Sequence, residues 1–302
     1  MSAGWKGVIA AGGTGSRLHP TTQVFNKHLL PVYDKPMIYY PLTTLMLGGI
    51  RDILVISTRE ALPQFERLMG DGRQWGVTIS YLPQDRPSGI ADCLRVAAPS
   101  IEDRSVALLL GDNIFFGAGL GRLISTAAKR NEGASVFVYE VADPGAFGIM
   151  TLDSDGRPLS IMEKPEEPTS KLVVVGLYLY GPDVTDLARR LSPSHRGELE
   201  ITDINRAYLD QGRLQVYPLG RGFAWLDGGT PNDLFEACQF IKVMEARTGL
   251  KIGCPEEVAY RMGYITLDAL EASAERLPAG DYATYLLSIA ASERKQSARP
   301  SP

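Results

Sequence analysis

The sequence predicts an α/β fold in which a mainly parallel β-sheet is flanked by helices. Short runs rich in Val, Ile and Leu alternate with stretches of helical spacing, which is the order of β-α-β crossover units. These runs are continuously apolar, as expected for strands that are buried on both faces. With 302 residues, of which 44% are hydrophobic, the chain is long enough to bury a large core of this class.

The apolar runs predict strands, in order along the chain, at 7–11, 53–57, 78–82, 106–110 and 134–139. From residue 147 the runs are shorter, and they predict a small antiparallel extension with strands at 148–152, 159–163, 172–180 and 214–217. Helical spacing predicts helices at 203–211 and 232–248. We therefore expect one domain at 1–250, a helical C-terminal region at 251–292 and, because little there can be buried, a disordered tail at 293–302.

The composition limits the partners that the chain can have. Its formal net charge of −4 offers no basic surface for general nucleic-acid binding. No apolar run approaches the ~18 residues of a membrane helix, and we expect no charged-then-apolar leader. The three cysteines and three histidines lack the spacing of a disulfide scaffold or a metal centre. We expect a cytoplasmic protein with buried, reduced thiols, which binds any metal through carboxylates.

The segment VIAAGGTGSRLHP, at residues 8–20, predicts a turn that holds phosphate. Its glycines lack the Cβ atoms that would keep an anion away from the backbone amides, and two cations follow them. These residues are Gly12, Gly13, Gly15, Arg17 and Lys27. The GxxxxGK loop of nucleoside triphosphatases is absent, and Leu18 replaces the third glycine of the dinucleotide fingerprint. Without the cations, the glycines fit an ordinary strand-to-helix turn equally well.

Two aspartates follow apolar runs at distant places in the sequence. Asp112 lies in LLLGDN and Asp227 lies in AWLDGG. Because ligands of a parallel sheet lie beyond the carboxyl ends of its strands, Asp112 and the glycine turn are expected to open on one crevice. Two carboxylates can share Mg²⁺, which prefers oxygen ligands and bridges them to substrate phosphates. Taken singly, each aspartate is better explained as a helix cap or a turn former, and only the combination favours a metal site.

Taken together, these motifs resemble the nucleotide-sugar pyrophosphorylases. The family's order and spacing are matched by AAGGTGSRLHP, NKHLLP, LLLGDN, EKP, RGELEITDIN and AWLDGGT. The resemblance runs from about residue 6 to about residue 285, and it is closest to the short glucose-1-phosphate thymidylyltransferases. It implies a Rossmann-like nucleotide-diphospho-sugar transferase fold, with a catalytic domain at 1–250 that includes a sugar-binding region at about 147–230. It also implies a homotetramer that converts dTTP and glucose 1-phosphate to dTDP-glucose and pyrophosphate with Mg²⁺.

The resemblance implies roles for the residues that match the family's motifs. The catalytic cations would be Arg17, Lys27 and Lys164. The nucleotide would be held by Gly12, Gly13, Gln84, Gly89 and Asp112. The sugar would be held by Phe147, Gly148, Glu163, Lys164, Val174 and Trp225. The metal would be bound by Asp112 and Asp227. A second, regulatory nucleotide site between subunits would include Gly117, Gly220, Arg221, Glu257 and Arg261. Surface salt bridges are the alternative for the two arginines of that second site.

Several positions depart from the family's pattern. Phe147 replaces a tyrosine that touches the sugar, Asn26 and His28 flank Lys27 in place of serine and glutamine, and Gly228 replaces a threonine. In the base-reading segment QDRPSGIADC, Asp92 is one of the replaced residues. These departures leave open UTP instead of dTTP, a different or modified hexose 1-phosphate and, less favoured, a non-catalytic sugar-nucleotide-binding homologue.

Overall fold

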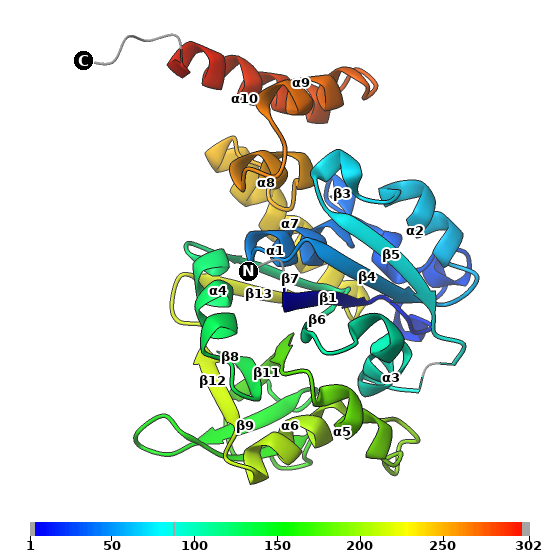
Figure 1. Ribbon diagram of the computed structural model, residues 1–302, viewed down its shortest axis with the longest axis vertical. Coiled ribbons are helices and arrows are strands. Elements are labelled where there is room, and N and C mark those ends of the chain that lie inside the picture. Colours follow the sequence, from blue (N-terminus) through cyan, green and yellow to red (C-terminus); the bar gives the residue numbers. More distant parts are fainter. Residues whose placement is uncertain (1–3, 87, 298–302) are drawn as a thin grey trace.

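The computed structural model describes residues 4–86 and 88–297, and a nine-stranded β-sheet forms its centre (Figure 1). The strands of this sheet are β1 (Trp5–Ala10), β4 (Asp52–Ser57), β5 (Thr78–Pro83), β6 (Ser105–Leu110), β8 (Ala134–Glu140), β9 (Gly148–Leu152), β10 (Pro158–Glu163), β11 (Leu172–Tyr180) and β12 (Leu214–Pro218). Two small antiparallel sheets accompany it, one of β7 (Asn113–Gly117) with β13 (Phe223–Asp227), the other of β2 (Pro31–Val32) with β3 (Lys35–Pro36). All nine strands predicted from the sequence are present.

The order of hydrogen-bonded strands is β10-β9-β11-β6-β1-β4-β5, and β8 joins β11 to β12. Strands β6, β1, β4 and β5 are parallel, as predicted. Strand β11 enters antiparallel between β6 and β8, and β9 and β10 form an antiparallel pair beside it. The predicted antiparallel extension is therefore continuous with the main sheet, but its last strand was predicted wrongly: β12 pairs parallel with β8.

Helices cover both faces of the sheet. Helices α1 (Tyr39–Leu47), α2 (Leu62–Met69) and α4 (Leu120–Arg130) pack on one face, and α3 (Ile90–Ile101), α5 (Val184–Arg190) and α6 (Ile201–Asp210) pack on the other. Successive strand residues point to opposite faces, so Val8 and Ile9 are both fully buried but belong to different apolar clusters. This two-sided burial is the physical reason for the continuous apolar runs in the sequence.

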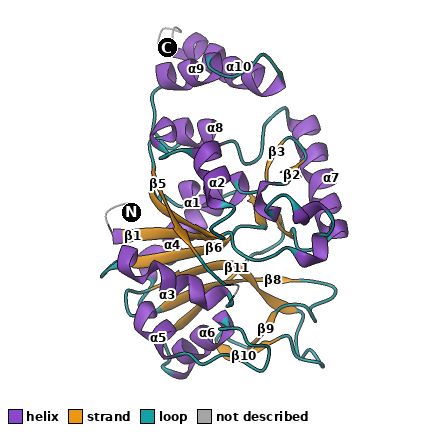
Figure 2. Cartoon of the chain, turned by 90° about the vertical axis from the view of Figure 1, so that its right-hand side faces the viewer, coloured by secondary structure: helices purple, strands orange, loops and turns teal. Residues whose placement is uncertain are grey.

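The remaining helices follow the sheet in sequence: α7 (Pro231–Thr248), α8 (Pro255–Arg261), α9 (Leu267–Glu275) and α10 (Asp281–Ser297). Helices α9 and α10 lie together at the end of the molecule opposite α5 and α6 (Figures 1 and 2). The expected disordered tail was wrong for residues 293–297, which continue α10. Glu293 and Arg294 pair with residues of α8 and α9, which extends the helix beyond its apolar part. Residues 298–302 lie outside the described part.

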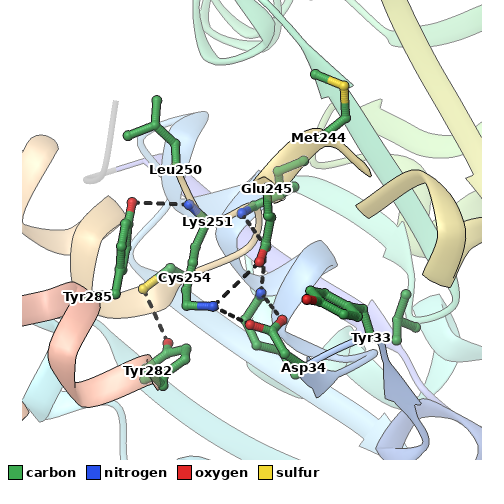
Figure 3. Close-up of polar contacts among 12 residues, drawn as sticks. Tyr33, Asp34, Met244, Glu245, Leu250, Lys251, Cys254, Tyr282 and Tyr285 are labelled. Carbon is green, nitrogen blue, oxygen red and sulfur yellow. Dashed lines mark hydrogen bonds and ion pairs between the residues drawn. The ribbon is translucent and has the colours of Figure 1, made fainter. Parts of the chain in front are cut away.

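A buried charged cluster joins the C-terminal region to the body of the protein (Figure 3). The Lys35 ammonium is almost fully buried and lies 2.8 Å from the carboxylate of Glu245 on α7. Asp34 pairs with both Lys35 and Lys251. The Tyr285 hydroxyl of α10 accepts a hydrogen bond from the Lys251 amide at 3.1 Å. The cluster therefore fixes the start of the helical region against α7 and the β2–β3 turn.

The cysteines match the expectation of buried thiols in part. All three cysteines are free; Cys93 and Cys254 are buried as expected, whereas Cys238 is partly exposed. Within the described residues, no helix combines the length and apolar character that crossing a bilayer requires.

Candidate active site

A cavity of about 430 Å³ lies at the carboxyl ends of the parallel strands. Residues that follow β1, β5 and β6 line one part of it, and residues of β9, β10, β11 and α6 line another. The prediction that the glycine turn and Asp112 open on one crevice is confirmed. The cavity gathers the residues assigned to nucleotide, metal and sugar, which are Gly12, Gly13, Arg17, Lys27, Gln84, Gly89, Asp112, Phe147, Gly148, Glu163, Lys164, Val174, Trp225 and Asp227.

The glycine turn is shaped by close backbone contacts. A Cβ atom at Gly12 would lie 2.6 Å from Oε1 of Gln84, so only glycine lets that side chain pack against the loop. Gly13 has a φ of 95°, a conformation that side chains other than hydrogen rarely allow. Arg17 lies on the short 3₁₀ turn Ser16–Leu18 and is exposed at the rim. The turn therefore places backbone groups and the exposed guanidinium of Arg17 at the cavity.

Asn26 holds the loop that carries Lys27. Its Nδ2 donates to the carbonyl of Ala11 at 3.2 Å, and its Oδ1 accepts from the backbone N–H of His28 at 2.9 Å. The same oxygen lies 2.8 Å from Nδ1 of the His28 ring. Burial and the neighbouring Lys27 charge lower the pKa of His28 to about 3, so its ring is neutral at physiological pH. The two departures Asn26 and His28 thus form one hydrogen-bonded pair, which anchors Lys27 to the end of β1.

The two aspartates are brought together by a strand pair that the sequence did not predict. Asp112 precedes β7, Asp227 ends β13, and Asn113 of β7 is paired with Asp227 in the register. Lys27 forms an ion pair with Asp112. Although burial opposes ionisation of Asp112, the Lys27 charge holds its pKa low, at about 2. Burial and repulsion from Asp112 raise the pKa of Asp227 to about 7.

This carboxylate pair fits Mg²⁺. Burial and the neighbouring Asp112 charge both raise the pKa of Asp227, and a divalent ion beside the two carboxylates would favour its ionised form. No group of three or more potential Asp, Glu, His or Cys ligands occurs among residues 4–86 and 88–297. Mg²⁺ commonly uses one or two carboxylates and takes its other ligands from water and substrate phosphates, so two are sufficient.

Close packing beside Asp112 and Asp227 explains why glycine replaces the family's threonine at position 228. Its backbone N–H donates to the carbonyl of Asp112 at 2.9 Å. A Cβ atom at this position would lie 2.6 Å from Cε of Met37, so a threonine would require the methionine to move. Glycine therefore keeps the turn after Asp227 close to Asp112.

The expected sugar residues lie around the β9–β10 pair. Glu163 is paired with Gly148 in the register, and it accepts a hydrogen bond from the hydroxyl of Thr202 at 2.5 Å. Lys164 has a φ of 40°, which is uncommon for a residue with a side chain. Its backbone N–H donates to the carbonyl of Phe147 at 3.1 Å, which holds this strained residue in place. The side chain of Lys164 is half-exposed, and its ammonium lies 3.8 Å from the Glu163 carboxylate, so it can also contact an anion in the cavity.

Aromatic side chains close this part of the cavity. The rings of Phe147 and Trp225 pack edge to face with centroids 5.1 Å apart. The indole N–H of Trp225 donates to Oδ1 of Asn113 at 2.7 Å. Val174 is buried in β11 and contributes apolar wall.

Several polar residues that line the same cavity were not predicted from the sequence, and four of them lie close to the predicted residues. These four are Asn113, Tyr178, Arg196 and Thr202. Arg196 lies 2.6 Å from Glu198, 3.4 Å from Glu200 and 3.7 Å from Glu163. It is the first residue of RGELEITDIN, a segment that carried the resemblance but suggested no role for the arginine. The position of Arg196 could not be predicted from the local sequence, because it depends on how α6 packs against β10.

None of the residues expected in the regulatory site lines this cavity. Gly117 ends β7, Gly220 and Arg221 lie in the turn before β13, and Glu257 and Arg261 lie on α8. Glu257 accepts a hydrogen bond from Tyr285 at 2.5 Å. Arg261 is paired with Glu293 at 2.5 Å. The second nucleotide site remains a prediction.

Comparison with known proteins shows the family of the chain. The model of the family described as nucleotidyl transferase matches residues 6–243. A glucose-1-phosphate thymidylyltransferase of Xanthomonas campestris pv. campestris (strain B100) is 50% identical over 94% of this chain and 97% of its own length. One from Mycobacterium tuberculosis (strain CDC 1551 / Oshkosh) is 51% identical over 94% and 98%.

Solved structures have the same fold. A protein from Bacillus anthracis, described as a glucose-1-phosphate thymidylyltransferase in complex with a sucrose, is 39% identical. It aligns with a TM-score of 0.73 over 78% of this chain and 94% of its own. A UDP-glucose pyrophosphorylase, 22% identical with a TM-score of 0.71, shares the fold over 81% of this chain and 100% of its own. The chain therefore belongs to the nucleotidyl transferase family and, within it, to the glucose-1-phosphate thymidylyltransferases.

Proposed function

We propose that this protein transfers the thymidylyl group of dTTP to glucose 1-phosphate, forming dTDP-glucose and pyrophosphate. The observation that carries the proposal is the gathering of three cationic side chains and two carboxylates on one cavity: Arg17, Lys27, Lys164, Asp112 and Asp227. Such a set suits two polyanionic reactants and a divalent ion. The names of the relatives support the choice of nucleotide and sugar.

The reaction requires no covalent enzyme adduct. An oxygen of the sugar phosphate attacks the α-phosphorus in line, the bond from that phosphorus to the bridging oxygen breaks, and pyrophosphate leaves with the electron pair. The attacking phosphate is already ionised, so the protein contributes positioning and charge neutralisation. Burial raises the pKa of Cys93, which lines the cavity, to about 12, so its thiol stays protonated and does not compete as a nucleophile.

The glycine turn and two cations would hold the triphosphate. Gly12 and Gly13 let the backbone approach the phosphates, and the exposed Arg17 guanidinium would bind the departing pyrophosphate through paired hydrogen bonds. Lys27 would lie at the α-phosphate. Its ammonium, which is paired with Asp112 in the structure, would then contact the substrate phosphate as well. Gln84 and the backbone of Gly89 would read the pyrimidine edge.

Asp112 and Asp227 would hold Mg²⁺. When bound, the ion would neutralise negative charge that develops on the phosphates during the displacement. Lys27 keeps Asp112 ionised before the metal arrives, since it holds the pKa of that carboxyl low. The protein thus presents at least one ready carboxylate at physiological pH.

The other part of the cavity would bind glucose 1-phosphate. Lys164 would bind its phosphate, while Glu163 would accept hydrogen bonds from sugar hydroxyls. Gly148 and Val174 would line the pocket, and the edge-to-face pair of Phe147 and Trp225 would pack against the sugar. We further propose, from the resemblance, that the protein acts as a homotetramer in the cytoplasm.

Release of pyrophosphate tests the proposal. The full-length protein, Mg²⁺ and each pairing of dTTP, UTP, dCTP and ATP with glucose, galactose and amino- or deoxyhexose 1-phosphates would be assayed. We expect the highest kcat/KM with dTTP and glucose 1-phosphate. A higher value for UTP or for another hexose would correct the substrate, and no release with any pair would contradict the function.

A further inference from the structure

Gln84 has a defined orientation at the wall of the cavity. It follows β5, its backbone N–H donates to the carbonyl of Ser57 at 2.8 Å, and it is only 6% exposed. Its Nε2 donates to Oδ2 of Asp92 at 3.0 Å and to the carbonyl of Gly89 at 3.4 Å. Its Oε1 lies on the opposite side, packed against Gly12.

The hydrogen-bond partners of the Gln84 carboxamide determine which of its two ends is the oxygen and which is the NH₂ group. A carboxylate and a backbone carbonyl can only accept hydrogen bonds, so the NH₂ group must face Asp92 and Gly89. Both of its protons are then used. The oxygen must face Gly12, a lining residue of the cavity, where the thiol of Cys93 is its other neighbour at 3.9 Å.

Asp92 itself does not line the cavity. It lies in the first turn of α3, whose positive end favours a carboxylate, and accepts the hydrogen bond from Gln84. The side chain that would meet the base is therefore Gln84, and Asp92 can influence the base only through it. Asp92 is also one of the positions at which this chain departs from the family's usual base-reading segment.

We infer that Asp92 sets the base preference of the nucleotide site by making Gln84 present only an acceptor to the base. The inference rests on the proposed role of Gln84 in binding the nucleotide. Thymine and uracil carry a donor, the N3–H group, that matches this oxygen. Cytosine carries a lone pair at N3, so two acceptors would face each other without a proton between them.

The inference makes Asp92 a positioning residue with a specific consequence. With Asp92 removed, only the longer hydrogen bond to the Gly89 carbonyl, at 3.4 Å, opposes rotation of the Gln84 amide. The amide can then turn over, donate to cytosine N3 and accept from its amino group. Discrimination between the bases then falls. A site built to hydrogen-bond one pattern rejects the mismatched analogue strongly, so the wild type should prefer dTTP over dCTP by at least ~100-fold in kcat/KM.

The test compares Asp92→Ala, Asp92→Asn, Gln84→Ala and the Gln84→Ala/Asp92→Ala double variant. The kcat/KM for dTTP and dCTP would be measured by pyrophosphate release with glucose 1-phosphate. The two dissociation constants would be measured by equilibrium dialysis without sugar. Thermal midpoints report folding, and Asp103→Ala, an exposed acid just beyond α3, controls for charge removal.

We expect Asp92→Ala to reduce the dTTP-to-dCTP ratio by about tenfold or more. Asp92→Asn keeps an acceptor oxygen and should stay within about threefold of the wild type. In the Gln84→Ala background, Asp92→Ala should change the ratio no further, since the effect passes through Gln84. N3-methyl-dTTP, which has lost the donor, should bind the wild type at least about tenfold more weakly than dTTP.

Three results would overturn the inference. An Asp92→Ala ratio equal to that of the wild type would show that Asp92 does not orient the amide. Equal losses in Asp92→Ala and Asp92→Asn would assign the effect to charge at the helix start. Tight binding of N3-methyl-dTTP would show that Oε1 does not accept from the base. If no triphosphate releases pyrophosphate, the proposed function fails, whereas the dialysis ratio still decides the role of Asp92.

Discussion

Asn113 and Asp227 face each other across the β7–β13 pair, and Nδ2 of Asn113 donates to the Asp227 carboxylate at 3.3 Å. The same nitrogen donates to Asp112 at 3.0 Å. Oδ1 of Asn113 accepts hydrogen bonds from the indole N–H of Trp225 and from the backbone N–H of Gly176, the latter at 3.1 Å. One buried carboxamide therefore links both carboxylates of the expected metal site to the wall of the sugar pocket.

Asn113→Ala should weaken Mg²⁺ binding and lower kcat by ~10- to 100-fold, because the carboxylates lose the donor that orients them. Calorimetric titration with Mg²⁺ measures the first effect, and pyrophosphate release measures the second. Trp225→Phe is the matched control, since it removes only the indole donor. It should change the KM for the sugar phosphate and leave Mg²⁺ affinity within about twofold. Unchanged Mg²⁺ affinity in Asn113→Ala would contradict this account.

Asp227 should impose a pH dependence on the metal-free protein. Its pKa in the folded state is raised to about 7, by burial and by Asp112, whereas an aspartate in an unfolded chain ionises near about 3.9. The folded state thus keeps the proton to higher pH, and this group makes the free energy of unfolding fall as the pH rises from about 4 to about 7. Asp227→Asn, whose side chain does not ionise, should lack this decrease in the free energy of unfolding.

Thermal melts in the presence of a chelator check the sign of this effect. Between about pH 5 and about pH 8, the Tm of the wild type should fall relative to that of Asp227→Asn, and Mg²⁺ should restore it more at the higher pH. A wild-type Tm that rises relative to the variant over this interval would show that Asp227 ionises normally.

Lys164→Met should raise the KM for glucose 1-phosphate by ~10- to 100-fold, because a charge-assisted hydrogen bond to phosphate is lost. Methionine keeps most of the aliphatic stem, so packing is largely retained. Lys171→Met, at an exposed site outside the cavity, is the control and should behave like the wild type. Steady-state kinetics at saturating dTTP measure both. The role of Lys164 would be wrong if its variant kept the wild-type KM.

Phe147→Tyr should lower the KM for glucose 1-phosphate by ~2- to 10-fold, since it adds a hydroxyl that can bond to the sugar. The ring itself already packs against Trp225, so the fold should be unaffected. The assay is again pyrophosphate release, with glucose and deoxyhexose 1-phosphates compared. A KM that stays the same or rises for glucose 1-phosphate would indicate a different sugar substrate.

Glu245→Ala should lower the free energy of unfolding by roughly 3 kcal/mol, because it leaves the buried ammonium of Lys35 with one partner fewer. Urea unfolding followed by circular dichroism measures the change. Asp186→Ala breaks the exposed pair with Arg189 and should cost less than about 1 kcal/mol. Similar losses in the two variants would show that the cluster in Figure 3 does not stabilise the fold.

The sequence predicted those parts of the site whose position follows from strand topology. Gly12 and Asp112 each follow a buried parallel strand, and such strands end at one edge of a sheet. Asp227 could be assigned only through the resemblance, because its place depends on the pairing of β7 with β13. The short run NIFFG gave no separate strand signal after the longer run of β6.

Long-range side-chain contacts could not be predicted from the sequence. Nothing in the local pattern shows that Arg196 faces Glu163, or that Asp92 binds Gln84 eight residues away rather than water. The extent of α10 was missed for a related reason. Residues 293–297 have little to bury, but a helix already begun needs few added contacts to continue, and Arg294 pairs with Glu271 at 2.5 Å.

The stereochemistry of the reaction at phosphorus tests the central claim most directly. The enzyme would be given glucose 1-phosphate, Mg²⁺ and one diastereomer of dTTP carrying sulfur on the α-phosphate, and the product would be examined by ³¹P NMR. The account predicts thio-dTDP-glucose with inverted configuration, as a single in-line displacement requires. Retention of configuration would reveal a covalent intermediate, and absence of product under conditions where dTTP also fails would contradict thymidylyl transfer itself.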